Sequence, residues 1–213
     1  PFTVVGRPPQ EDTSFGALIH SMTGSAIQKE IPGLKEVNAV DAAGVHPLLL
    51  AIGSERYTPY IPATQPAEIL TIANHMLGTG QLSLAKFLFI TADPENKLNT
   101  KNIEQYFQFV LERIHLDRDV HFYTNTTVDT LDYSGEQLNK GSKVVFAAYG
   151  NPVRKLSSET LPELSEIRGY KGARMVKPGI LALGAASQYK NAVEAKQEIQ
   201  SLCEHISQLI KEK

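Results

Sequence analysis

Apolar positions along the first 150 residues follow two spacings, one typical of helices and the other of strands. Apolar side chains recur every three or four residues in three stretches, which predicts helices over residues 14–31, 66–77 and 99–114. Short apolar runs predict strands at residues 2–5, 48–52, 86–92, 120–125 and 142–150. Because strands and helices alternate, we expect an α/β fold with a mixed, mostly parallel sheet flanked by helices.

Turn and capping residues add detail to this pattern. A short glycine-containing segment, residues 42–45, separates two strand-like runs and predicts a β-hairpin. Either Asn99 or Thr100 can cap the third helix, because both side chains accept hydrogen bonds from the free amides at a helix start. The buried stripe of that helix is expected to include Ile103 and Val110.

The residue pattern changes after position 150, so we divide the chain into an α/β domain (residues 1–150) and an extension (residues 151–213). Residues 151–173 are predicted to form a loop-rich connection, which is followed by one strand within residues 175–185. An amphipathic helix over residues 190–210 closes the chain, and its apolar stripe requires a partner surface. The stripe packs either on the chain's own core or on a second subunit.

Composition excludes several functional classes. The 213 residues carry a net charge of −2, which argues against electrostatic binding to nucleic acid or to an anionic membrane. No apolar run is long enough to span a membrane. The single cysteine, Cys203, rules out an internal disulfide, fits a reducing compartment and predicts a cytoplasmic location.

Common catalytic motifs are missing from the sequence. The six histidines are dispersed and never lie at the paired spacing that a helical metal site needs, so no metal site is predicted. There is no G-x-S-x-G nucleophile elbow. Gly78 and Gly80 lack the third glycine of a dinucleotide-binding loop and follow a predicted helix, which favours a simple glycine turn.

Asp93 ends the predicted strand at residues 86–92. In an open α/β sheet, ligands bind at the carboxyl ends of the strands, so this position is a candidate for ligand contact. An Asp-Pro pair before a helix is also ordinary turn chemistry, and we favour that interpretation.

The polar loop that follows the first predicted strand is a second candidate. Arg7 carries a forked donor suited to a carboxylate or phosphate, and Pro8 and Pro9 stiffen the backbone beside it. Glu11 and Asp12 can pair with Arg7, orient it or contact a ligand. The alternative is a solvated turn, which accounts for the charges but not for the two prolines.

Four segments of this chain resemble a known family. TVVGRPPQEDTSFG is similar to the G-R-P-P-x-E segment of UbiD-type decarboxylases, which remove CO2 from aromatic and α,β-unsaturated acids. Three further elements follow in the family's order: EIP before the predicted hairpin, then AKFLFITAD, then LDYSGEQLNKGSKVVFAA. The resemblance spans residues 3–148 and weakens from residue 151 onward.

The resemblance implies that the chain is the C-terminal domain of a longer protein and follows a larger flavin-binding domain. In this family the electron sink is a prenylated FMN, held with the help of a divalent metal. The acid–base residues lie in the flavin-binding domain. The expectation is therefore that this chain contains no catalytic residue, no metal and no cofactor of its own, and that the flavin-binding domain is its partner.

The resemblance also implies which residues approach the substrate. Arg7, Glu11, Thr13 and Tyr149 are the candidates for the substrate cleft. Some relatives use a lysine to reach the cofactor phosphate, near the position where this sequence has Thr79. Cofactor-binding residues therefore remain unassigned.

Three hypotheses remain after this comparison of motifs. The first is the C-terminal domain of a UbiD-like carboxy-lyase that acts on an aromatic or unsaturated acid such as a quinone precursor. It is expected to be inactive alone and to form a homo-oligomer through residues 190–210. The alternative is a non-catalytic assembly module of the same fold. The third, an independent nucleotide-binding protein, is disfavoured by the poor glycine loop.

Overall fold

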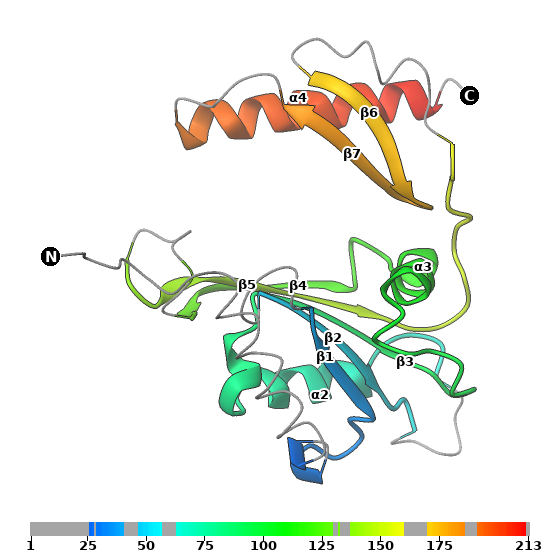
Figure 1. The fold of residues 1–213 in the computed structure, drawn as a ribbon, viewed down its shortest axis with the longest axis vertical. Helices are drawn as coiled ribbons and strands as arrows, with labels where there is room; N and C mark the ends of the chain where they lie inside the picture. Colours follow the sequence, from blue (N-terminus) through cyan, green and yellow to red (C-terminus); the bar gives the residue numbers. More distant parts are fainter. Residues whose placement is uncertain are drawn as a thin grey trace, which may run out of the picture. The chain divides into compact units, whose positions relative to one another are not determined.

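A computed structural model of the chain describes residues 26–27, 29–40, 47–56, 63–129, 132, 137–159, 170–185 and 191–211 (Figure 1). The predicted strand at residues 2–5 and the turn at residues 42–45 lie outside this part of the chain. The fold divides into two compact units, Pro1–Lys155 and Leu156–Lys213.

A five-stranded mixed sheet forms the centre of the first unit, in the spatial order β1-β2-β3-β5-β4. Its strands are β1 (Glu36–Ala39), β2 (Leu48–Gly53), β3 (Phe87–Ala92), β4 (Val120–Thr127) and β5 (Lys140–Ala148). The three central strands are parallel, and β1 and β4 pair antiparallel at the two edges. The predicted mixed α/β sheet is confirmed, and antiparallel β1 and β2 are the predicted hairpin strands.

Two helices cover opposite faces of this sheet, α2 (Glu68–Leu77) and α3 (Ile103–Arg113) (Figure 1). Successive residues of a strand point to opposite faces, so each central strand contributes to both layers. On β2, Leu49 packs in the α2 layer, whereas Leu50 packs in the α3 layer. This explains why residues 48–52 form a continuous apolar run.

The start of α3 differs from the sequence prediction. Asn102 is the capping residue, and its Oδ1 accepts the amide of Gln105 at 3.3 Å. Asn99 instead accepts the amide of Lys101 in the preceding turn, at 2.7 Å. Thr100 is buried and donates through its hydroxyl to Glu36 on β1, at 2.5 Å. The predicted caps are wrong because both side chains have other partners.

Tyr106 anchors α3 to the sheet. Its ring is fully buried, and its hydroxyl lies 2.7 Å from the Ala51 carbonyl and 2.8 Å from the Phe89 carbonyl. The Ala51 amide donates to the same hydroxyl at 3.3 Å. Val110 is buried as predicted, but Ile103 is 40% exposed, so the buried stripe is displaced from the predicted one.

Glu55, just beyond β2, caps the start of α2. Its carboxylate accepts the amides of Ala67 at 2.7 Å, Glu68 at 3.0 Å and Ile69 at 3.0 Å. These are amides that a helix leaves without an internal partner, and a negative charge there also interacts favourably with the helix dipole.

The second unit contains a β-hairpin, β6 (Tyr170–Lys177) and β7 (Ile180–Ala185), and the helix α4 (Ala192–Lys211). The prediction of a single strand within residues 175–185 is wrong, because the chain turns at Gly179, whose φ is +77°. Strand β6 also begins inside the segment predicted as loop. The C-terminal amphipathic helix is confirmed, and Val193 and Ile199 on it are 65% and 49% exposed. None of the described helices has the length and apolar character needed to cross a membrane.

Candidate functional site

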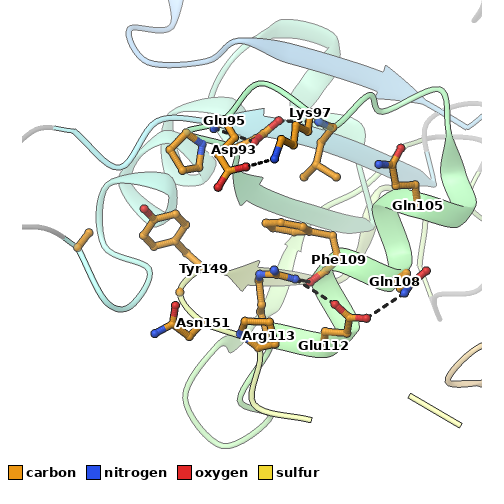
Figure 2. Close-up of a pocket in the computed structure, with 15 residues that line it drawn as sticks. Asp93, Glu95, Lys97, Gln105, Gln108, Phe109, Glu112, Arg113, Tyr149 and Asn151 are labelled. Carbon is orange, nitrogen blue, oxygen red and sulfur yellow. Dashed lines mark hydrogen bonds and ion pairs between the residues drawn. The ribbon is translucent and has the colours of Figure 1, made fainter. Parts of the chain in front are cut away.

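A pocket of about 550 Å³ lies at the carboxyl ends of β3 and β5, beside α3 (Figure 2). Its walls are the loop at residues 93–98, one face of α3, and residues 149–152 after β5, with Ala63 at one side. This is the edge of a parallel sheet at which α/β proteins bind ligands, because the loops there converge.

One face of α3 supplies most of the polar wall. Its lining residues are spaced at three, four, seven and eight positions, so they share a helix face: Gln105, Gln108, Phe109, Glu112 and Arg113. The amide of Gln108 donates to Glu112 Oε1 at 2.9 Å, which helps to fix the orientation of that carboxylate.

Arg113 is held in one orientation by three contacts. Its Nη1 donates to the Phe109 carbonyl at 3.0 Å and to Glu112 Oε2 at 3.3 Å. Its guanidinium lies over the Phe109 ring, 3.6 Å from the centroid, in a cation–π contact. The side chains of Arg113 and Glu112 are only 15% and 24% exposed. The pocket therefore contains a largely buried, preorganised donor–acceptor pair (Figure 2).

The loop after β3 is ordered by Asp93. This residue is 4% exposed, and its carboxylate accepts the amides of Glu95 at 3.1 Å and Leu98 at 2.6 Å. Lys35 Nζ donates to the Asp93 carbonyl at 3.1 Å. These bonds are typical of a turn, which agrees with the favoured interpretation of Asp93 from the sequence. The same turn forms one wall of the pocket.

An ion pair between Lys97 and Glu95 marks the rim of the pocket. Its hydrogen bond to the Glu95 carboxylate, followed by the charge of that carboxylate, raises the pKa of Lys97 above its usual value. Both side chains are mostly exposed, so solvent screens the pair and it adds little to stability.

Tyr149 and Gly150 form the wall that follows β5. Tyr149 is partly buried against the α2-side core and lines the pocket. Gly150 has a φ of +112°, and a Cβ at this position would lie 2.5 Å from the Thr64 carbonyl oxygen. Glycine is therefore required where the chain leaves β5 and approaches the segment before α2.

Of the predicted cleft residues, the structure places Tyr149 in the pocket, whereas Arg7, Glu11 and Thr13 lie outside the described residues. Their role in a substrate cleft remains a prediction. Sequence reasoning missed Glu112 and Arg113. Their signal was a polar stripe on the helix after β3, which is hard to distinguish from a solvated helix face.

Thr79 and the lysines near it lie at the other end of the sheet. Thr79 precedes the short 3-10 helix η2 (Gly80–Leu84), and Lys86 pairs with Asp132 at 2.6 Å before β3 begins. Lys143 on β5 is 6% exposed and donates to the Ser83 carbonyl. Burial lowers the pKa of Lys143. None of these side chains lines the pocket.

The described ranges contain no group of three or more histidine, cysteine, aspartate or glutamate side chains able to hold a metal ion. The amides at the start of α2, a position suited to a phosphate, already bind Glu55. The described residues thus do not fit a metal or a flavin phosphate at these places.

Comparison with known proteins gives a family match over residues 13–148. The matching family is described as the C-terminal domain of 3-octaprenyl-4-hydroxybenzoate carboxy-lyase. The chain is 37% identical over 184 residues to an uncharacterized protein of Chlamydia trachomatis, a match that covers 86% of this chain and 28% of that protein. It is 36% identical over 175 residues to a protein of Chlamydia pneumoniae that is named as a component of 4-hydroxybenzoate decarboxylase, a match that covers 82% of this chain and 26% of that protein.

The fold is similar to that of a solved decarboxylase. The apo crystal structure of 3,4-dihydroxybenzoic acid decarboxylase from Klebsiella pneumoniae matches with a TM-score of 0.53 over 72% of this chain and 33% of that chain, at 16% sequence identity. The chain therefore spans little more than a quarter of the length of the Chlamydia relatives and a third of this structure.

Proposed function

This chain belongs to the UbiD family of carboxy-lyases, and on that premise we propose that it forms one wall of the substrate cleft of a decarboxylase. The substrate is an aromatic or unsaturated acid, such as a quinone precursor. The chain acts together with an N-terminal flavin-binding domain of the same protein and is inactive without it.

The observation that carries this proposal is the pocket at the carboxyl ends of β3 and β5, where Tyr149 and Phe109 supply aromatic surface. A planar acid can pack against such rings while its polar groups meet the side chains of α3. Arg7, Glu11 and Thr13 remain candidates for the same cleft.

Loss of CO2 from an unsaturated carbon requires an electron sink, which side chains supply poorly. In this family a prenylated FMN supplies it, with a divalent metal. We assign both groups to the N-terminal domain, because the described part of this chain has no metal-binding cluster and uses the α2 amides to bind Glu55. This chain's own contribution is to bind and orient the substrate and to exclude water.

The test uses the full-length protein loaded with prenylated FMN and follows CO2 release. Tyr149→Ala is expected to lower kcat/KM about tenfold, since an aromatic contact and its buried area are lost. Phe122→Ala is the matched control, because Phe122 is 74% exposed and does not line the pocket. An unchanged kcat/KM for Tyr149→Ala would refute the cleft proposal.

The exposed apolar residues of α4 support a second proposal, in which the domain serves assembly of a homo-oligomer. Val193 and Ile199 are 65% and 49% exposed, and exposed apolar side chains on a helix are stabilised when a partner covers them. Removal of residues 190–213 is expected to change the oligomeric state measured by light scattering. An unchanged mass with an intact fold would contradict this role.

A further inference from the structure

We propose that Glu36 and Asn38 on the edge strand β1 are positioning residues for the pocket, because they hold the loop between β3 and α3 (residues 93–102) in place. This loop is then a fixed wall of the pocket and not a lid that closes over a substrate. The inference rests on the proposed function, since it concerns how the same pocket receives its ligand.

Glu36 and Asn38 both bind one residue of this loop, Thr100. Glu36 Oε1 accepts the Thr100 amide at 3.1 Å and the Thr100 hydroxyl at 2.5 Å. Asn38 Nδ2 donates to the Thr100 carbonyl at 3.0 Å. Thr100 is fully buried, so β1 supplies a partner for its amide, its hydroxyl and its carbonyl. The end of the loop that leads into α3 is therefore fixed to the edge strand.

Lys35, the residue before β1, binds the other end of the loop. Its Nζ donates to the Asp93 carbonyl at 3.1 Å and to Asn96 Oδ1 at 3.2 Å. Beside these contacts, the Asp93 carboxylate accepts the amides of Glu95 and Leu98. The pocket-lining part of the loop is therefore held from within and by contacts on both of its sides.

The contacts come from the face of β1 that lies opposite the α2 layer. Val37 packs in the α2 layer, so its neighbours Glu36 and Asn38 project from the other face. Both bind the same loop residue, which lies 64 and 62 positions away in the sequence. Thr100 lies just before Asn102, the cap of α3, and α3 is itself a wall of the pocket. Glu36 and Asn38 therefore set the position of the loop and of the start of α3.

The contacts of Thr100 argue against a lid. Segments that open and close come from the less stable parts of a protein, where few contacts are lost. Opening this loop removes the partners of three polar groups on a buried residue, which is unfavourable. A preformed wall also spares a ligand the free energy of ordering a loop, so the affinity of the pocket depends on the β1 contacts.

The first test is hydrogen exchange of the backbone amides in the 213-residue chain. In Glu36→Ala the Thr100 amide loses its acceptor and is expected to exchange about tenfold faster, while the β3 amides keep their rates. Asn38→Ala leaves the Thr100 carbonyl without its donor and is expected to change the same rate in the same direction. Glu36→Gln keeps an acceptor oxygen and is expected to preserve most of the protection.

Glu198→Ala, exposed on α4, is the control and leaves both sets of exchange rates unchanged. An unchanged rate at Thr100 in Glu36→Ala would overturn the inference. Equally faster exchange throughout β3 would also overturn it, because Glu36 would then serve the stability of the whole sheet.

The second test measures CO2 release by the full-length protein loaded with prenylated FMN, with 4-hydroxybenzoate as the probe. Without the β1 contacts the ligand must order the loop, but the ordered complex reacts as before. Glu36→Ala is therefore expected to raise KM about tenfold and to leave kcat within about twofold, whereas Glu36→Gln stays close to the unaltered enzyme. A lower kcat with an unchanged KM, or unchanged constants together with faster exchange at Thr100, would refute the positioning role.

Failure of this inference is distinguishable from failure of the proposed function. If Tyr149→Ala lowers kcat/KM but Glu36→Ala leaves KM unchanged, only the positioning role is refuted. If the unaltered protein releases no CO2, the proposed function fails, and the exchange rates alone confirm or refute the fixed wall.

Discussion

Tyr106→Phe is expected to destabilise the first unit by removing one oxygen atom from its interior. The hydroxyl contacts the backbone of two neighbouring strands, at 2.7 Å from the Ala51 carbonyl, 2.8 Å from the Phe89 carbonyl and 3.3 Å from the Ala51 amide. The ring remains in place, so the loss is that of hydrogen bonds rather than of packing.

The magnitude follows from what the substitution leaves behind. A hydroxyl has one hydrogen, so it donates to one carbonyl at a time while accepting from the Ala51 amide. Each buried group deprived of its partner costs about 1–3 kcal/mol. Because strand neighbours take over part of this bonding, we expect the free energy of unfolding to fall by about 2 kcal/mol and the Tm by about 4–8 °C.

The assay is urea unfolding followed by circular dichroism, with hydrogen exchange of β2 and β3 amides as a local readout. Tyr149→Phe is the matched control, because no described residue hydrogen-bonds to the Tyr149 hydroxyl and the expected change is within about 0.5 kcal/mol. A Tyr106→Phe protein as stable as the control would refute the reasoning.

Alkaline pH gives a second test of the same residue. Burial raises the pKa of the Tyr106 hydroxyl above its usual value of 10, so the folded state keeps a proton that the unfolded state releases. Stability conferred by Tyr106 is therefore complete below pH 10 and is lost as the pH rises above it. The difference in free energy of unfolding between Tyr106→Phe and the unaltered chain is expected to shrink above pH 10.

Three further substitutions test local features of the first unit by urea unfolding. Glu55→Ala is expected to lower the free energy of unfolding by about 1–2 kcal/mol, because the start of α2 loses its carboxylate. Glu198→Ala, exposed on α4, is the control and changes stability little. Equal effects of the two substitutions would contradict the capping role. Gly150→Ala is expected to lower the free energy of unfolding by about 2 kcal/mol or more, through backbone strain and the close backbone contact. Gly80→Ala, at another positive φ but with open space around it, is expected to lower it less. The reverse order would refute the contact. The lowered pKa of Lys143 means that its buried charge costs stability at neutral pH, and this cost disappears as the pH approaches 10.5. The stability difference between the unaltered chain and Lys143→Met is thus expected to move in favour of the unaltered chain with rising pH, and a pH-independent difference would count against it.

Much of the first unit was predictable because its pattern is local. The run at residues 48–52 reads as a strand buried on both faces, and Leu49 and Leu50 do pack in different layers. The start of α3 was not predictable in the same way. Asn99, Thr100 and Asn102 can all cap a helix, and the choice among them depends on Glu36, a distant residue that binds Thr100.

The second unit illustrates a different limit. The apolar run at residues 175–185 is interrupted by Lys177-Pro178-Gly179, and a Pro-Gly pair marks turns, so the sequence did contain a signal for this hairpin. The apolar residues on both sides favour a strand and obscure so short a turn signal. The cross-strand register between β6 and β7 establishes that the chain reverses there.

The sequence by itself determined the family, the alternation of strands and helices, and the C-terminal amphipathic helix, because each depends on residues close together in the chain. The tertiary structure alone decided that the turn at Asp93, the Glu112–Arg113 pair on α3 and Tyr149 after β5 line one pocket. Parallel strands joined by helices bring such distant segments to one edge of the sheet. The spacing of residues along the chain does not show which segments come together there.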